Sequence, residues 1–228
     1  MQLFSAKNYK ETYEGTQRCS LMYNRFIIEQ SDTAAHLILA LRSFDLSDTT
    51  ELLVIKLLQK LTKQSPLLGQ KMLENGAAKL LVRRLQSWSF ESEQVFRTVE
   101  IIWNLHDSSI TIARSDPEST TLLLLVDQLA DIDSLAPLHN LFVYHLHKPF
   151  SAASRQLRND ALVLASLVAK YRPSSAFLET GFGQLLLNLA TLEELGGKST
   201  LAVANNREDF ELKKLLINFA SLIVYVYL

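Results

Sequence analysis

The sequence predicts an all-α protein in which repeated helical units stack into an α-solenoid. Only seven glycines and five prolines occur among 228 residues, so the residues that most often interrupt helices are scarce. The phrase "LENGAAKLL" at residues 73–81 also returns as "LETGFGQLL" at residues 178–186, with Leu-Glu-x-Gly and the closing Leu-Leu retained. Internal repeats of this kind are typical of proteins built from stacked helical units.

A short helical motif occurs four times along the chain. It consists of two apolar residues, any residue, a polar residue and then Leu or Phe, and it ends at Leu61, Leu105, Leu167 and Phe219. The spacings are 44, 62 and 52 residues. The first matches the period of about 40 to 47 residues in armadillo and HEAT units, and the longer ones leave room for an inserted helix or loop. We therefore expect an armadillo- or HEAT-like solenoid, with the stacked helices forming a right-handed superhelix.

The helices expected in the first half of the chain lie at residues 20–30, 32–44, 48–63, 66–74, 77–87 and 91–106. Asp48 and Ser92 are suited to cap helix N-termini, because their side-chain oxygens can accept from a free backbone N–H group. Pro66 forbids continuation of the helix before it. Gly76 is expected at a corner, since glycine tolerates positive φ and lets two helices meet closely.

The helices expected in the second half lie at residues 117–131, 133–147, 153–171, 174–180, 182–194 and 207–226. Asp116 is a plausible N-cap, with Pro117 at the first helical position. Pro173 ends the helix before it, as Pro66 does. Gly181 is then expected to form the same structural corner as Gly76.

The chain is expected to contain one repeat domain, at residues 25–228, after a polar N-terminal segment at residues 1–24. The most loop-like tracts, at residues 106–116 and 196–209, are too short to separate domains. The last predicted helix reaches Leu228 with an apolar, uncapped end. This indicates a portion or a short form of a longer solenoid.

Charge and composition exclude several classes of function. The chain carries 23 basic and 24 acidic side chains and has a pI of about 6.5, so no overall field attracts nucleic acid or an anionic membrane. Its longest apolar runs are much shorter than the roughly 20 residues that span a bilayer. A lone cysteine, Cys19, forms no internal disulfide and fits a reducing compartment. We expect neither nucleic acid nor membrane as a partner.

No motif points to catalysis, and we expect no cofactor, no metal and no small-molecule substrate. His139, His145 and His147 lack the i, i+3 or i, i+4 spacing of helical metal sites, so we interpret them as histidines at the solvent edge. Cys19 has no histidine near it in the sequence. The stretch "ELGGKST" at residues 194–200 lacks a required glycine of the phosphate-binding loop. The chain is therefore expected not to be an enzyme, and a hydrolase or transferase using His145 or Cys19 is a remote alternative.

The polar position of the repeated motif is the candidate partner-binding feature. In a solenoid the equivalent faces of successive helices align, so these side chains and their stripe neighbours could form a ladder along one surface. The candidate face comprises Lys60, Arg97, Asn104, Ser166, Lys214 and Asn218. Asparagine both donates to and accepts from an extended backbone, which would suit a peptide-binding groove. A solvated helix face is the simpler interpretation.

Two neighbouring features are interpreted as ordinary parts of the fold. Trp103 continues an apolar stripe with Phe96 and Val99, so we expect it in the core. The run "KLLVRRL" at residues 79–85 forms a local basic patch, which we expect to be a solvated face.

Several specific stretches resemble one family of armadillo-type repeat proteins, which is associated with cilia and flagella. These are "VFRTVEIIWNL" at residues 95–105, "RQLRNDALVLASLVAKYRP" at 155–173 followed by "LETGFGQLL", and "REDFELKKLLIN" at 207–218. The strings "RQLRND" and "EDFELKKLL" are more specific than leucine periodicity, and the resemblance extends over most of residues 26–223.

The resemblance implies an axonemal component of the central apparatus of motile cilia and sperm flagella, needed for flagellar assembly and motility. It implies a cytoplasmic and axonemal location, other axonemal or ciliary proteins as partners, and no catalytic residues. The main expectation is therefore a non-enzymatic scaffold that holds its neighbours through helical faces. The alternative is a peptide-binding adaptor that uses Asn104 and Asn218 in a groove.

Overall fold

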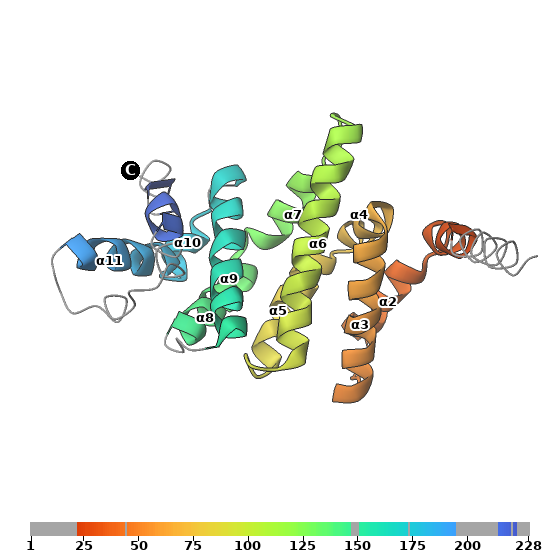
Figure 1. Ribbon diagram of the computed structural model, residues 1–228, viewed down its shortest axis with the longest axis horizontal. Coiled ribbons are helices and arrows are strands. Elements are labelled where there is room, and N and C mark those ends of the chain that lie inside the picture. The colour runs from red at the N-terminus through yellow and green to blue at the C-terminus, as the bar shows by residue number, and fades with distance from the viewer. Residues whose placement is uncertain are drawn as a thin grey trace, which may run out of the picture.

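The chain folds as a row of stacked three-helix units (Figure 1). The computed structural model describes residues 22–43, 45–146, 151–172, 174–194, 214–219 and 221–222. Each unit has a first helix, a second helix and a third helix, and four such units can be traced in the described part. Because these residues contain helices and no strand, the predicted all-α solenoid is confirmed.

The helices of the first two units follow from the capping and breaking residues between them, except that Ser47 and not the expected Asp48 is the N-cap of α3. The first unit contains a helix at residues 22–30, α2 (Thr33–Ser43) and α3 (Asp48–Gln64). The second contains α4 (Pro66–Glu74), α5 (Ala77–Arg84) with the 3-10 turn η1 (Leu85–Ser87), and α6 (Glu93–Ser115). Pro66 starts α4, and Ser92 Oγ caps α6 by accepting from Val95 N.

The last two units repeat this order. The third contains α7 (Thr121–Leu129), α8 (Ile132–Leu146) and α9 (Ala152–Tyr171). The fourth contains α10 (Ala176–Glu179), α11 (Phe182–Glu194) and the helical residues 214–219 and 221–222. In Figure 1 the third helices α3, α6 and α9 lie side by side, with α2, α5 and α8 behind them.

The third helices explain the four copies of the sequence motif, because each copy lies in one of them. The spacing of 62 residues between Leu105 and Leu167 needs no extra helix among the described residues. It arises because α6 continues to Ser115, because residues 116–120 connect α6 to α7 where Ser65 alone connects α3 to α4, and because α8 and α9 are long.

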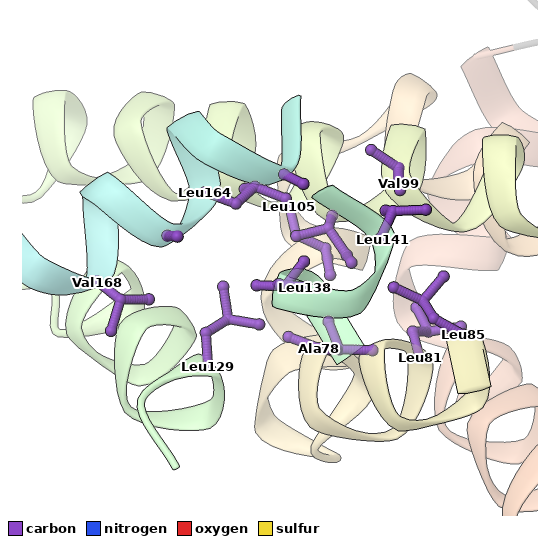
Figure 2. Close-up of a cluster of buried hydrophobic side chains, with 14 of the residues drawn as sticks. Ala78, Leu81, Leu85, Val99, Leu105, Leu129, Leu138, Leu141, Leu164 and Val168 are labelled. Carbon is purple, nitrogen blue, oxygen red and sulfur yellow. The ribbon is translucent and has the colours of Figure 1, made fainter. Parts of the chain in front are cut away.

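One continuous core runs between neighbouring units. α6 contacts the helices of its own unit and also α3, α7 and α9. In Figure 2, Val99 and Leu105 of α6 gather in one cluster with buried side chains of α5, α7, α8 and α9. Burying a leucine side chain contributes roughly 1.5 to 3 kcal/mol, so each unit depends on its neighbours for stability.

The corners between first and second helices are alike in the second and fourth units. Gly76 has φ 75° and Gly181 has φ 72°, and these are the positive-φ residues of the described chain. Each donates its N–H three residues back, Gly76 to Leu73 O and Gly181 to Leu178 O. In the third unit Asp131 occupies the corner, and its Oδ1 accepts from Ser134 N at 2.9 Å.

Side chains from one unit bind the corner of the unit before it, at three successive junctions. Lys71 Nζ donates to the carbonyl oxygens of Glu29 and Ser31 at 2.7 and 3.1 Å. Gln128 Nε2 donates to Leu73 O at 2.6 Å. Ser174 Oγ donates to Ala130 O at 2.7 Å. These contacts, which we call corner locks, fix how each unit sits on the previous one.

Residues 106–115, expected as a loop, are the C-terminal part of α6. Their hydroxyl groups bond back along the helix, as Ser109 Oγ does to Leu105 O at 2.8 Å, so polarity does not break it. Ser108 is buried beside Gly69 of α4. Asp116 was expected to cap the next helix, but it ends α6, and α7 begins later, at Thr121.

Candidate functional site: the third-helix face

The candidate site is the surface formed by the third helices, which we call the third-helix face. It is carried by α3, α6, α9 and the helical residues 214–219, and α3, α6 and α9 are neighbours in Figure 1. All of the predicted partner-binding residues lie on these helices. Some of these side chains are already hydrogen-bonded to other residues of the chain, and others are not.

Arg97 and Asn104 of α6 are bound to α3. Asn104 Nδ2 donates to Thr62 Oγ1 at 3.2 Å, so one N–H of this amide is used within the fold. Arg97 donates to Gln59 Oε1 through Nη1 and to Glu93 Oε1 through Nε, the latter at 2.8 Å. These two predicted residues therefore stabilise the junction between the first and second units.

Charged side chains extend this junction in both directions. Lys56 Nζ lies 3.1 Å from Glu93 Oε1, and Lys63 Nζ lies 3.8 Å from Glu100 Oε1. Gln59 Nε2 also donates to Glu100 Oε2. The hydrogen bonds from Arg97 and Lys56 lower the pKa of Glu93. The α3–α6 junction is thus closed by polar pairs over most of its length.

The other predicted residues are not brought into this network. Lys60, Lys214 and Asn218 are exposed. Ser166 is half-buried, and its Oγ donates to Val163 O of its own helix at 2.8 Å. Of the predicted residues, Arg97 and Asn104 are therefore the two that bond to a neighbouring third helix in the described part, and a common partner-binding ladder stays a prediction.

A groove of about 490 Å³ lies on the outer side of α3. Leu53, Lys56, Leu57 and Lys60 line it at i, i+3, i+4 and i+7, so they form one stripe of the helix. Gln59 and Arg97 close it on the side of α6. We call this the α3 groove. Lys60 and Arg97 were predicted from the sequence and the two leucines were not, although the spacing of the leucines on the polar side of α3 can be read from the sequence.

A second pocket, of about 370 Å³, lies between α6 and α9. The aromatic side chains of Phe96 and Trp103 line it together with Glu100, Asp107 and Asp160. Burial raises the pKa of Asp160 to about 6, although Gln156 and Trp103 lie against the carboxyl group and lower it. Trp103 Nε1 is buried beside this carboxyl group without a hydrogen bond of ordinary geometry. Trp103, expected in the core, is half-buried and packs between the core and this pocket.

The basic residues of α5, expected as a solvated face, remain partly exposed and also pair with neighbouring units. Lys79 pairs with Asp131 and Arg83 pairs with Asp133, both at the start of α8. Arg84 Nη2 donates to Leu41 O at 2.6 Å. The long side chains therefore connect α5 to the units on either side.

The histidines also differ from the expected solvent edge. His145 is buried, and its Nε2 bonds with the carbonyl oxygen of Phe90 at 3.1 Å. His139 packs against Phe182, and burial lowers its pKa. No group of side chains suited to a metal ion occurs among the described residues. His147, Cys19 and Gly196 to Ser199 lie outside them.

The helices of the described chain are too short or too polar to cross a bilayer.

Comparisons with known proteins point to one family. The family model described as "Cilia- and flagella-associated protein 69, ARM repeat" matches residues 1–225. Proteins named Cilia- and flagella-associated protein 69 from Papio anubis and Homo sapiens are each 29% identical over 219 residues, and the one from Mus musculus is 28% identical. The match covers 94% of this chain, which spans 22% of the length of these relatives. No solved structure matches the chain significantly.

Proposed function

The chain belongs to the armadillo-repeat family of cilia- and flagella-associated protein 69, and from this premise we propose that it is a non-enzymatic scaffold of the ciliary and flagellar axoneme. It is located in the cilium or flagellum and in the cytoplasm from which these are assembled. Within the axoneme it belongs to the central apparatus, and it supports flagellar assembly and motility. Its partners are other axonemal or ciliary proteins, held on the third-helix face.

The observation that carries this proposal is the way each unit is locked to the one before it. A scaffold must hold its partners at fixed separations, which requires units that do not turn against one another. The corner locks from Lys71, Gln128 and Ser174 provide this at three successive junctions. The polar pairs between α3 and α6 add further contacts at the junction of the first and second units, on the third-helix face.

The alternative is an adaptor that reads an extended peptide with Asn104 and Asn218. It has less support, because Asn104 Nδ2 already donates to Thr62 Oγ1 and Ser166 bonds within α9. Asn218 is exposed and shares its helical segment with exposed Lys214, but no hydrogen bond in the described part connects it to Asn104.

The experiment is expression of a tagged chain in a ciliated cell, followed by detergent and salt extraction of isolated axonemes. A scaffold of the axoneme remains with the microtubules after the membrane and soluble matrix are removed. The Asn104→Ala, Asn218→Ala double variant tests the adaptor, since the scaffold proposal expects its retention to match that of the unchanged chain. A chain that stays entirely in the soluble fraction would overturn the proposal.

A further inference from the structure

The α3 groove combines exposed apolar side chains with positive charge. Leu53 is 61% exposed and Leu57 is 49% exposed, one turn apart on the same stripe of α3. A single exposed leucine is ordinary, but here two of them lie side by side in a groove rather than on a convex surface. A partner that covered them would remove apolar surface from water at little cost in ordering, because α3 is already held by α2, α4 and α6.

The charged residues of the groove determine which partner fits. Lys56, Lys60 and Arg97 all line it, and none of its lining residues in the described part of the chain is a carboxylate. Lys56 and Arg97 share one carboxylate, that of Glu93, outside the groove. Lys60 is exposed and makes no ion pair within the described residues. The groove therefore has a net positive rim beside an apolar floor.

We propose that the α3 groove binds an acidic amphipathic segment of a partner protein, whose apolar side chains cover Leu53 and Leu57 and whose carboxylates meet Lys60 and Arg97. The inference deepens the proposed scaffold function and rests on it, since it names the chemistry of one partner on the third-helix face. Complementary charges place the segment and suppress basic competitors, and covering the leucines removes apolar surface from water.

Nucleic acid fits this groove less well. A phosphate backbone is bound by many cations in a row, with affinity set by the number of phosphates neutralised. Here two leucines lie between the cations, and the overall charge of the chain is −1. A helix that presents leucines and glutamates contacts both the leucines and the cations of the groove.

The test is fluorescence polarisation with labelled helical peptides of about 18 residues, long enough to form helix on a surface. Each peptide has leucines at i, i+3, i+4 and i+7, and the remaining positions are rich in glutamate, lysine or glutamine. The glutamate peptide is expected to bind the full chain saturably and more tightly than the glutamine peptide, with the lysine peptide weakest. Raising the salt concentration should weaken the glutamate peptide, since charges near the surface are screened within about 8 Å at physiological ionic strength.

Two variants locate the site, and two matched variants control for general effects. Leu57→Glu should weaken the glutamate peptide about tenfold, because it removes an apolar contact and adds a charge of the same sign as the peptide. Lys60→Glu should weaken it a few-fold and strengthen the lysine peptide, because the rim charge is reversed. Leu178→Glu, at a leucine 60% exposed on α10, and Lys170→Glu, on α9, should change neither. Circular dichroism shows that each variant is folded.

Three results would overturn the inference. They are no saturable binding of the glutamate peptide, equal binding of all three peptides, and equal effects of the groove and control variants. If the tagged chain is retained in axonemes but gives any of these results, the scaffold proposal stands and the acidic segment is excluded. If the chain binds the glutamate peptide as expected but is absent from axonemes, the acidic segment stands and the scaffold proposal is excluded.

Discussion

Gln128 of α7 donates a hydrogen bond of 2.6 Å to the carbonyl oxygen of Leu73, across the junction between the second and third units. The Oε1 of the same amide accepts from Ala78 N at 3.1 Å, one of the N–H groups that α5 leaves without a helical partner. The Gln128 side chain thus donates to a carbonyl group before Gly76 and accepts from an N–H group after it.

Replacing Gln128 with alanine is expected to lower the free energy of unfolding by about 1 to 2 kcal/mol, because the buried Ala78 N–H loses its acceptor. Urea denaturation followed by circular dichroism measures this. The matched control is Gln184→Ala, whose amide bonds to Asn188 on the exposed side of α11. Equal stabilities of the two variants would show that the corner lock contributes nothing.

The bond from Asn104 to Thr62 predicts a coupling between the third helices of two units. Asn104→Ala and Thr62→Val should each destabilise the fold, and the double variant should lose less than the sum. The expected coupling is about 0.5 to 1.5 kcal/mol, the net contribution of one hydrogen bond. A double-mutant cycle in urea measures it, with Asn218→Ala as an exposed asparagine that should have no effect. Strict additivity would mean that the two residues do not interact in solution.

Gly69 of α4 is in closer contact with α6 than any larger residue allows. A Cβ at this position would lie 2.7 Å from Ser108 Oγ and 2.8 Å from Ser108 Cβ. Gly69→Ala should therefore cost about 1 to 3 kcal/mol, the range of overpacked sites, although alanine favours helix. Ser108→Gly should restore part of this loss when both changes are combined. Thermal melting of the four proteins tests the pair, and a Gly69→Ala variant as stable as the original would contradict the close contact.

Asp160 makes stability depend on pH in an unusual direction. Its pKa is raised to about 6 in the fold from an ordinary value of 3.8, so between these values the folded chain binds more protons than the unfolded chain. The raised pKa of Asp160 therefore lowers the free energy of unfolding as pH rises from about 4 to about 6, and this loss persists at higher pH. Asp160→Asn should remove it and stabilise the chain at pH 7 by an amount on the order of 1 kcal/mol, after allowance for the exposure of the group to solvent.

The measurement is the difference in unfolding free energy between Asp160→Asn and the unchanged chain at several pH values. Because other carboxyl groups contribute equally to both proteins, the difference isolates Asp160. It should be small near pH 4 and grow toward pH 7. A difference that is constant with pH would contradict the raised pKa.

Much of the helical framework could be predicted from the sequence, because its signals are local. Pro66 starts a helix and Gly76 turns a corner through the conformations of their own backbones. The helix at residues 106–115 was missed because the composition of this segment is polar. In the fold its hydroxyl groups bond back to backbone carbonyls, and Ser108 lies against Gly69 of α4, a contact that the local sequence does not show.

The site could be predicted only in part, because its properties depend on which helices are neighbours. The sequence placed Asn104 on a face with Arg97, but the partner Thr62 lies 42 residues away on α3. Likewise the environment of Asp160, beside Trp103 of another helix, cannot be seen in the sequence around it. The exposed leucines of α3 were visible, but only the fold shows that Arg97 completes a groove with them.

The most direct test of the proposal that the α3 groove of the third-helix face holds the chain among axonemal neighbours compares groove variants with variants outside the groove, in ciliated cells. Tagged chains carrying Leu57→Glu with Lys60→Glu, or Leu178→Glu with Lys170→Glu, are scored for the fraction that remains in salt-washed axonemes. We expect the first pair to be lost to the soluble fraction and the second to be retained like the unchanged chain. Equal retention of both pairs would contradict the role of the groove.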